Sequence, residues 1–397
     1  MIKRTLQLVG ALALVGFIYL NISYWNDPAF WRRWWDTVTH LAPDHMNFSP
    51  TVGIGSAAIS ELPTAPADAV TVAPEALRAA EAFAAEMDSF GLIVVHRGLI
   101  QTEWYGPGWD RDRLTQSQSM MKSITAMMTG LAIRDGYIDS VDDRIGKYID
   151  EWRDDPRGDI TVLNLLQMSS GLAQSRFTLN PFAQDSSFRF LFSADRARVV
   201  LGTPLEWEPG SKFDYNDINA QIAGLIVERA AGRPYADYLR EELWAPLGGQ
   251  HAEIWLDRED GLAMTACCLL ATPRDWTKVG LMMKDGGRFN GRQIVPEAWV
   301  EAMITPFAAG RGYGYLTWLG DSEAERTAMG PKRDGEQREP HDATDVFRLS
   351  GYGGQRVYVS REHDLVVVRL GPFAGMEPLN EGWDNTLLMN IIVRGLR

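Results

Sequence analysis

The most regular apolar pattern of the chain lies between Ser119 and Asp135, where apolar side chains recur with the period of a helix. They are frequent enough to bury most of the surface of such a helix. Gly136 follows directly and can end it, because glycine adopts the left-handed C-terminal conformation without a steric penalty. The pattern predicts a buried helix over 119–135, whose apolar positions are Met120, Ile124, Met127, Met128, Leu131 and Ile133.

Apolar and β-branched runs near both ends of the folded region predict strands. Phe90–Tyr105 has the pattern of a β-hairpin that turns at His96-Arg97-Gly98. Two further strands, 346–359 and 365–370, lie close to the C-terminus. We therefore expect one antiparallel sheet built from both termini, with a helical insert at roughly 139–265 covering one side. Shorter helices are predicted at 74–83, 160–168, 220–232 and 382–396.

The N-terminal segment predicts export. An apolar run, Leu6–Tyr24, follows Lys3 and Arg4 and is about long enough to span a bilayer. No small-x-small cleavage pattern follows the run, so we expect an uncleaved single-pass anchor in the inner membrane with the catalytic body in the periplasm. A cleaved signal peptide and a cytoplasmic body remain open, the latter because Arg32 and Arg33 weaken the charge asymmetry across the run.

The segment after the apolar run predicts a connection. Trp25–Trp35 suits either a membrane interface or an amphipathic linker helix. Residues 43–74 are rich in proline, alanine, serine and glycine and show no clear periodicity. The expected organisation is an anchor or signal at 1–27, a linker at 28–73 and one domain at 74–397.

Composition narrows the possible functions. The length of 397 residues fits one large domain or two coupled ones, and a net charge of −13 argues against nucleic-acid binding, which requires basic patches. The six histidines lack metal-ligand spacing and no phosphate-binding glycine loop precedes a helix, so we expect neither metal nor other cofactor. Cys267 and Cys268 are adjacent, and we expect them to be buried small residues in a helix, without a disulfide framework.

A hydroxyl and an amine stand out in the apolar helix. Ser119 and Lys122 are three residues apart, which places them on the same helix face. A serine becomes a nucleophile when a base takes its proton, and a lysine can be that base if burial or a second cation lowers its pKa. The N-terminus of the helix would also favour a developing oxyanion. The alternative is that Ser119 caps the helix and Lys122 is a surface lysine.

Three motifs in order strengthen the catalytic interpretation. They are Ser119-Met-Met-Lys122, the segment 210–217 and the segment 350–355. Together they resemble the serine β-lactamase-like hydrolases, most of all class C β-lactamases, 6-aminohexanoate-dimer hydrolases and related esterases. The resemblance extends from about Pro74 to the C-terminus. It implies an α/β fold of the α+β type, β-lactamase/transpeptidase-like, with a central antiparallel sheet flanked by helices.

The second motif of the family is Tyr-x-Asn, and its tyrosine lies beside the serine and the lysine. Here it is matched by Tyr215-Asn-Asp217, so the resemblance makes Tyr215 a proton shuttle. The alternative for Tyr215 is simple packing at a helix start. Asp217 departs from the family's asparagine, because a carboxylate only accepts hydrogen bonds and adds negative charge. It would suit a lysine partner or a cationic substrate amine, and it would oppose a substrate carboxylate.

The third motif departs further. β-Lactamases carry Lys-Thr-Gly on a strand beside the serine, whereas the matching strand here, 349–354, has no lysine. If this alignment holds, the Tyr352 N–H completes an oxyanion hole with that of Ser119, and a short slip transfers the role to Gly353 or Gly354. The substrate-binding and oxyanion candidates are therefore Ser119, Asp217, Gly351, Tyr352 and Gly353.

The resemblance implies acyl transfer through a Ser119 acyl-enzyme, with Lys122 and Tyr215 moving protons. The missing lysine and Asp217 favour an ester or short-amide substrate. A β-lactamase or D-Ala-D-Ala carboxypeptidase of the class C type is the alternative enzyme. A membrane-anchored, non-catalytic protein that binds peptidoglycan or a partner is the alternative from another class. The oligomeric state stays open.

Overall fold

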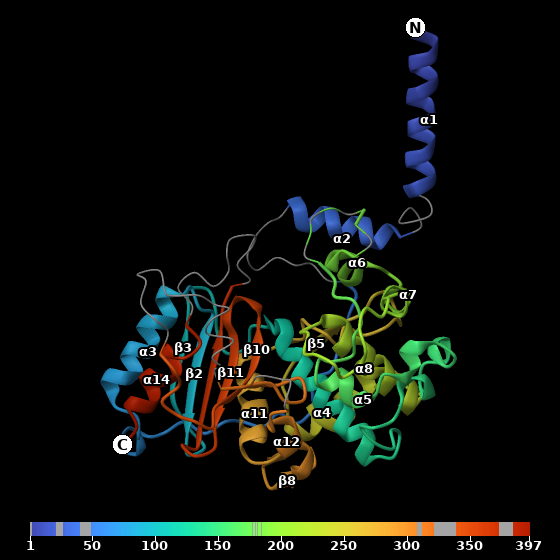
Figure 1. Ribbon diagram of the computed structural model, residues 1–397. Coiled ribbons are helices and arrows are strands. Elements are labelled where there is room, and N and C mark those ends of the chain that lie inside the picture. The colour runs from blue at the N-terminus through green and yellow to red at the C-terminus, as the bar shows by residue number, and fades with distance from the viewer. Residues whose placement is uncertain are drawn as a thin grey trace.

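The structure is a computed structural model of the chain (Figure 1). It describes residues 2–20, 27–39, 49–307 apart from 177, 179, 181 and 184, 312–320, 339–372 and 384–397.

A six-stranded antiparallel sheet joins the two ends of the folded region, as predicted. The hairpin of β2 (Gly91–His96) and β3 (Leu99–Tyr105) turns at the expected place. Its strand β2 pairs with β12 (Leu365–Leu370) near the C-terminus. The other strands continue the sheet in the order β3-β2-β12-β11-β10-β9, where β11 is Gln355–Ser360, β10 is Phe347–Gly351 and β9 is Trp318–Leu319.

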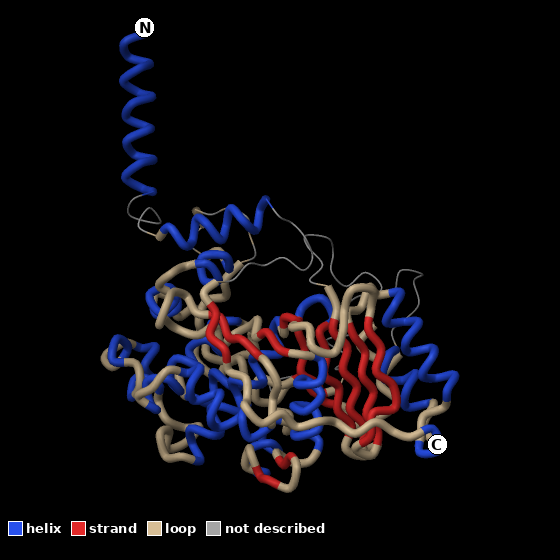
Figure 2. The backbone as a smooth tube through the Cα atoms, turned by 180° about the vertical axis from the view of Figure 1, so that it is seen from behind, coloured by secondary structure: helices blue, strands red, loops and turns tan. Residues whose placement is uncertain are grey.

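Helices cover both faces of the sheet because its strands are apolar on both sides. Leu365 and Val367 of β12 face α3 (Pro74–Glu86) and α14 (Leu387–Arg394). The alternate residues Val366 and Val368 belong to the core on the other side, where α11 (Pro273–Lys284) packs on the strands. The predicted start of the last helix, 382–383, lies outside the described residues. Figure 2 shows the strands of the sheet side by side from behind.

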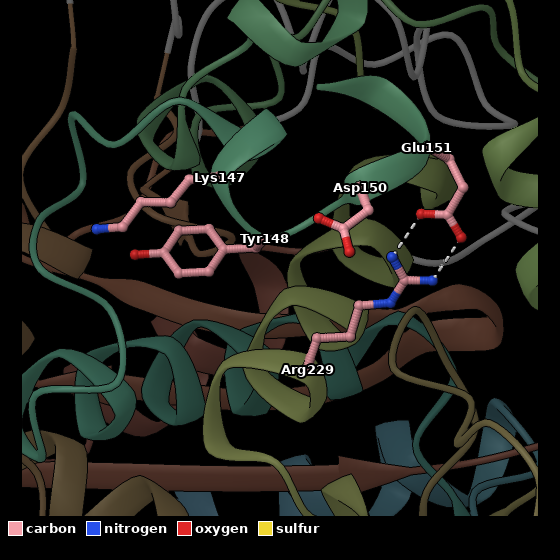
Figure 3. A pocket seen from close by; sticks show the side chains of 5 residues that line it. All are labelled: Lys147, Tyr148, Asp150, Glu151 and Arg229. Carbon is pink, nitrogen blue, oxygen red and sulfur yellow. Dashed lines mark hydrogen bonds and ion pairs between the residues drawn. The ribbon is translucent and has the colours of Figure 1, made fainter. Parts of the chain in front are cut away.

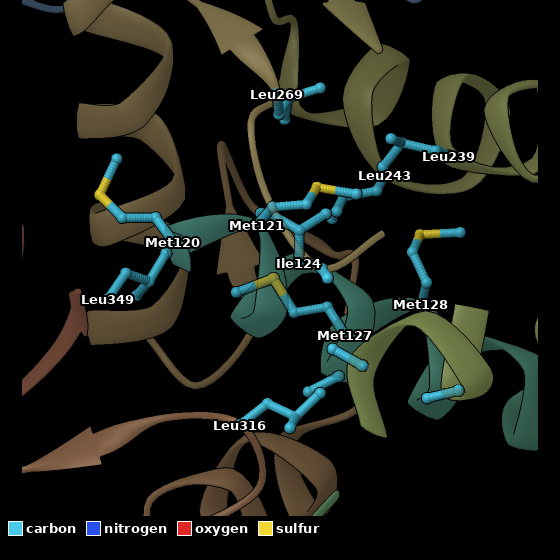
Figure 4. Close-up of a cluster of buried hydrophobic side chains, with 14 of the residues drawn as sticks. Met120, Met121, Ile124, Met127, Met128, Leu239, Leu243, Leu269, Leu316 and Leu349 are labelled. Atoms are coloured by element: carbon cyan, nitrogen blue, oxygen red, sulfur yellow. The ribbon is translucent and has the colours of Figure 1, made fainter. Parts of the chain in front are cut away.

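The predicted helix over 119–135 is present and buried. It begins as a 3₁₀ turn, η3 (Gln118–Met120), and continues as α4 (Met121–Arg134). Its methionines and Ile124 enter the main core, together with residues from distant segments such as Leu316 and Leu349 (Figure 4). The buried helix α8 (Asp217–Ala231) packs against α4. The first turn of α4 therefore lies where the sheet and the helical part of the molecule meet.

The region between the sheet-forming segments is mainly helical. It contains α5 (Val162–Leu166), α6 (Ser187–Phe192), α7 (Arg196–Leu201), α9 (Tyr235–Leu239) and α10 (Ala245–Leu247). A four-stranded sheet, ordered β1-β5-β6-β4, adjoins them and consists of β1 (Thr51–Gly53), β5 (Ala252–Trp255), β6 (Leu270–Ala271) and β4 (Thr115–Gln116). A two-stranded hairpin of β7 (Arg288–Phe289) and β8 (Arg292–Gln293) precedes α12 (Glu297–Met303).

The segment expected to be a linker is built into the body where the structure describes it. Helix α2 (Pro28–Thr39) packs on α6, and β1 pairs with β5. The buried side chain of Arg33 donates to the carbonyl oxygens of Phe192 and Asp257, both at 2.8 Å. Asp27 accepts hydrogen bonds from the Ser193 hydroxyl and from the Ala194 N–H, both at 2.8 Å. The amphipathic pattern of the Trp-rich piece thus reflects packing on the body.

Helix α1 (Ile2–Leu20) projects away from the rest of the molecule (Figures 1 and 2). The end of the predicted apolar run, 21–24, lies outside the described residues. Within the described part of the chain, none of the helices is both long enough and apolar enough to cross a membrane.

Candidate active site

Ser119 and Lys122 contact each other at the start of α4. The Lys122 ammonium nitrogen Nζ donates to Ser119 Oγ at 2.9 Å. The alternative of a surface lysine is wrong, because the Lys122 side chain is only 1% exposed. The buried face of the helix therefore carries a serine hydroxyl and a lysine in direct contact.

Asp217 determines the charge of that lysine. Nζ of Lys122 lies 2.6 Å from Asp217 Oδ1 and donates to the Ala266 carbonyl at 2.8 Å. With Ser119, these partners match the three N–H donors of an ammonium group. Burial is the largest influence on the Lys122 pKa and lowers it, but Asp217 and then Tyr215 outweigh burial, so the pKa lies above 10.5. The condition under which Lys122 could act as the base, a lowered pKa, is therefore not met.

Tyr215 and Asp217 come from the start of α8. Asn216 caps the helix, since its side chain accepts from the Ile218 N–H at 3.0 Å and donates to the Leu172 carbonyl at 2.9 Å. The side chain of Asn216 therefore stabilises the start of α8, and the neighbouring residues Tyr215 and Asp217 lie beside Lys122. Lys122 Nζ lies 5.1 Å from the centre of the Tyr215 ring. The structure thus brings the four residues Ser119, Lys122, Tyr215 and Asp217 together, and it selects the lysine-partner alternative for Asp217.

The end of β10 closely approaches η3, the turn that carries Ser119. A Cβ atom at Gly351 would lie 2.3 Å from the Ser117 carbonyl oxygen, so only glycine fits. Gly353 has a φ of 73°, which also favours glycine. Tyr352 between them is 43% exposed. The close approach agrees with the predicted place of the third motif, and the identity of the oxyanion N–H among 352–354 stays a prediction.

Comparison with known proteins identifies the family. The Beta-lactamase family model matches residues 78–380, which is most of the chain. This chain belongs to the beta-lactamase family.

Relatives in the beta-lactamase family differ in their named activities. The 6-aminohexanoate-dimer hydrolase of Paenarthrobacter ureafaciens is 27% identical over 221 residues, which cover 53% of this chain and 56% of that protein. A relative from Escherichia coli strain K12, provisionally named a D-alanyl-D-alanine carboxypeptidase, is 36% identical over 115 residues, covering 28% of this chain and 26% of its own. The matches therefore span about half or less of these curated relatives.

Solved structures with other names share the fold of this chain. A family VIII carboxylesterase has a TM-score of 0.61 at 19% identity and covers 82% of this chain and 98% of its own. The penicillin binding protein from Bacillus halodurans has a TM-score of 0.57 at 15% identity and covers 74% of this chain and 94% of its own. At such identities the likeness shows the fold, and it confirms the predicted β-lactamase/transpeptidase-like architecture.

The sequence did not indicate a loop that supports η3. In the segment 266–269, the Cys268 N–H donates to the Gln118 carbonyl at 3.0 Å, and the Leu269 carbonyl accepts from the Ser117 N–H at 2.9 Å. The carbonyl of Ala266 in the same segment accepts from Lys122, so this segment holds η3 and Lys122 together. The adjacent cysteines were the one available sequence signal for an unusual local structure.

The interpretation of Cys267 and Cys268 was therefore wrong. They are buried, as expected, but they form a disulfide with each other and lie in a loop before β6. Cys268 has a φ of 77°, a left-handed conformation that does not continue a right-handed helix. The two cysteines form this turn instead of the expected helix, and the turn lets the Cys268 N–H donate to the Gln118 carbonyl.

Two buried arginines also support the third motif. Arg356 donates to the Gly351 carbonyl, and Arg369 donates to the Gly353 carbonyl, both at 2.6 Å. Burial first, and then the charge of Arg356, lower the pKa of Arg369 to about 9. These side chains hold the glycine turn from behind. The two arginines lie in β11 and β12, whose sequences are mostly apolar. No sequence pattern indicates that an arginine in such a strand is buried.

A pocket of about 400 Å³ lies on the helical part of the molecule (Figure 3). Its lining is polar, but its charges are already paired. Arg229 donates to both oxygens of Glu151, at 2.7 and 2.9 Å, and Lys147 pairs with Asp143 at 3.0 Å. The side chains of this pocket therefore stabilise one another and do not form the nucleophilic site.

Proposed function

We propose that the chain is a serine hydrolase that acts on esters or short amides through an acyl-enzyme at Ser119. The contact of Ser119 Oγ with the buried Lys122 ammonium, backed by Asp217, is the observation that carries this proposal. A serine beside an ammonium and a phenol is equipped for nucleophilic acyl transfer. The names of the relatives, a 6-aminohexanoate-dimer hydrolase and a family VIII carboxylesterase, agree with this substrate range.

The protonation of Lys122 assigns the proton transfers. An ammonium cannot accept a proton, so the phenolic oxygen of Tyr215, which lies beside the same cation, relays the Ser119 proton toward the leaving group. Ser119 Oγ then attacks the substrate carbonyl, and the Lys122 ammonium stabilises the negative charge that develops on Ser119 Oγ. Tyr215 next delivers the proton to the leaving alcohol or amine. Water then attacks the acyl-enzyme, its proton passes through the same tyrosine to Ser119 Oγ, and the acid is released.

The charge around the site favours neutral substrates. The Asp217 side chain is 35% exposed, so a carboxylate lies at the edge of the site. The strand β10 offers Leu349-Ser-Gly where β-lactamases carry a lysine. A substrate carboxylate would meet a negative charge without a compensating lysine on that strand. We therefore place neutral esters and short amides ahead of β-lactams and D-Ala-D-Ala peptides.

The test is a substrate panel on the purified full chain, with a fluorophosphonate probe to label the nucleophile. We expect labelling of Ser119 and turnover of short p-nitrophenyl esters or of the 6-aminohexanoate dimer. Nitrocefin hydrolysis at the rate of a dedicated enzyme would favour the β-lactamase alternative instead. Absence of both labelling and turnover would favour the non-catalytic binding protein and refute the proposal.

We also propose that the N-terminal segment places the protein at the inner membrane with its catalytic body in the periplasm. Val9, Leu12, Leu14 and Val15 of α1 are each at least 58% exposed, more than isolated surface positions explain. The disulfide fits an oxidising compartment. Carbonate washing, the mature N-terminus and protease added to spheroplasts test this. A soluble protein that begins after Tyr24, or a body shielded from protease, would contradict it.

A further inference from the structure

The disulfide between the adjacent residues Cys267 and Cys268 lies in a segment that contacts the reacting groups of the site. On one side of the pair, the Ala266 carbonyl accepts a hydrogen bond from Lys122 Nζ at 2.8 Å. On the other side, the Cys268 N–H donates to the Gln118 carbonyl at 3.0 Å. Gln118 directly precedes the proposed nucleophile. The S–S bond therefore lies between two hydrogen bonds that reach the lysine and the serine turn.

Both residues of the second hydrogen bond have a left-handed backbone conformation. The φ angle is 48° at Gln118 and 77° at Cys268. A residue other than glycine adopts this conformation at a cost, so it persists only where the surrounding structure holds it. Besides their backbone hydrogen bond, Cys268 Sγ lies 3.7 Å from Gln118 Oε1. The conformation of the residue before Ser119 thus depends on the conformation of the cysteine turn.

The disulfide restricts the alternatives that are open to this turn. A bond between adjacent cysteines closes a small covalent ring that contains the peptide bond joining them. The ring limits rotation about the bonds of both residues, so fewer conformations compete with the observed one. Without the S–S bond, Cys268 could leave the left-handed region for a more favourable one. That change would move the N–H that binds Gln118 and the neighbouring carbonyl of Ala266.

We propose that the Cys267–Cys268 disulfide is a positioning element of the active site that holds the segment 266–269 in its turn. In this turn the segment fixes the direction of Ser119 and presents a carbonyl oxygen to Lys122. This inference rests on the proposed function. The hydrolase is fully active only when the cysteines are oxidised. A dithiol reductant breaks the S–S bond, leaves two thiols on the chain and itself becomes a disulfide. The relaxed turn then lowers the fraction of molecules whose reacting groups are correctly placed.

The test compares two variants of the full chain that lack the disulfide and differ by one methyl group. Cys267→Ala with Cys268→Ala leaves a Cβ at a φ of 77°, whereas Cys267→Ala with Cys268→Gly supplies a residue that adopts this angle readily. We expect the alanine variant to lose about tenfold in kcat per labelled Ser119, as for a small misplacement of reacting groups, with KM nearly unchanged. The glycine variant should regain about three- to fivefold of that loss.

A second comparison changes the oxidation state of the parent. The sequence contains two cysteines, so a thiol reductant has no other thiol or disulfide on which to act. Parent that is refolded from urea in dithiothreitol, and shown by alkylation to carry two thiols, should have the kcat of the alanine variant. Parent refolded without reductant should keep its full kcat. The alanine variant is the matched control, because it lacks both sulfur atoms and should not respond to dithiothreitol.

Fluorophosphonate labelling separates this inference from the hydrolase proposal. A parent that is neither labelled at Ser119 nor active refutes the hydrolase proposal, and this inference fails with it. If the parent is labelled and active, parental kcat per labelled site in the alanine variant overturns this inference alone, whatever the melting temperature of that variant. Equal kcat in the alanine and glycine variants, full kcat in the reduced parent, or an equal response of parent and alanine variant to dithiothreitol would also overturn it.

Discussion

The ion pair of Lys122 with Asp217 leads to the most informative prediction, which concerns Asp217→Asn. The substitution keeps the shape of the side chain and restores the asparagine that is usual in the family. It also leaves a lysine that is 1% exposed without its carboxylate, 2.6 Å away in the parent. At an effective dielectric constant of about 20, two unit charges at this distance attract by about 6 kcal/mol before the cost of desolvation.

The net effect on stability is smaller than this attraction. Removal of one partner of a buried pair typically costs about 3–5 kcal/mol. The Asp217 side chain is 35% exposed, and Lys122 can escape the unfavourable burial by releasing its proton. We therefore expect a loss of about 2–4 kcal/mol in the free energy of unfolding at pH 7, or a fall of about 4–8 °C in melting temperature.

The pH dependence has a definite sign. The pKa of Lys122 is raised in the folded protein, so its contribution to stability is complete below the unfolded value of 10.5 and disappears as the pH rises through the folded pKa. In the variant, burial is no longer opposed by Asp217, and the pKa of Lys122 should fall below 10.5. The stability difference between parent and variant should therefore shrink as the pH rises above neutral.

The assay is thermal unfolding of both proteins across pH 7 to about pH 10, followed by circular dichroism. Asp159→Asn is a suitable control, because Asp159 pairs with Arg144 at 2.9 Å in a position where both side chains are more than 60% exposed. That control should change the melting temperature little at any pH. Equal melting temperatures for the parent and Asp217→Asn would refute the conclusion that Asp217 keeps Lys122 charged.

Further predictions concern the nucleophile, the glycine turn and the docked helix. Ser119→Ala should retain the fold and lower turnover of the best ester by at least about a thousandfold, and parental activity would contradict its role. Gly351→Ala should reduce both activity and stability, because its Cβ would lie 2.3 Å from the Ser117 carbonyl oxygen. Gly98→Ala, in an open turn with a φ of 74°, is a control that should lose stability without an equal loss of kcat. Arg33→Ala should release α2 and make it sensitive to limited proteolysis, since the buried guanidinium binds carbonyl oxygens of two other segments. An unaltered cleavage pattern would show that the helix docks by its aromatic side chains.

The sequence by itself determined the secondary structure that carries the site. The apolar period between Ser119 and Asp135 is a local property, and it correctly predicted a buried helix. Spacing along that helix also predicted the contact of Ser119 with Lys122, because helix geometry brings residues three apart onto one face. The strand patterns near both ends likewise predicted the hairpin and the antiparallel sheet. All of these predictions follow from residues that are close together in the sequence.

Only the tertiary structure decided the chemistry of the site. Burial alone would lower the pKa of Lys122 and permit it to act as a base, but a carboxylate from the start of α8 raises the pKa instead. The contact of the cysteine loop with Gln118 and the docking of α2 through Arg33 likewise arise where separate segments meet. Charge, burial and hydrogen bonding are sums over everything that surrounds a group. Most of those surroundings come from elsewhere in the chain, so no local pattern contains them.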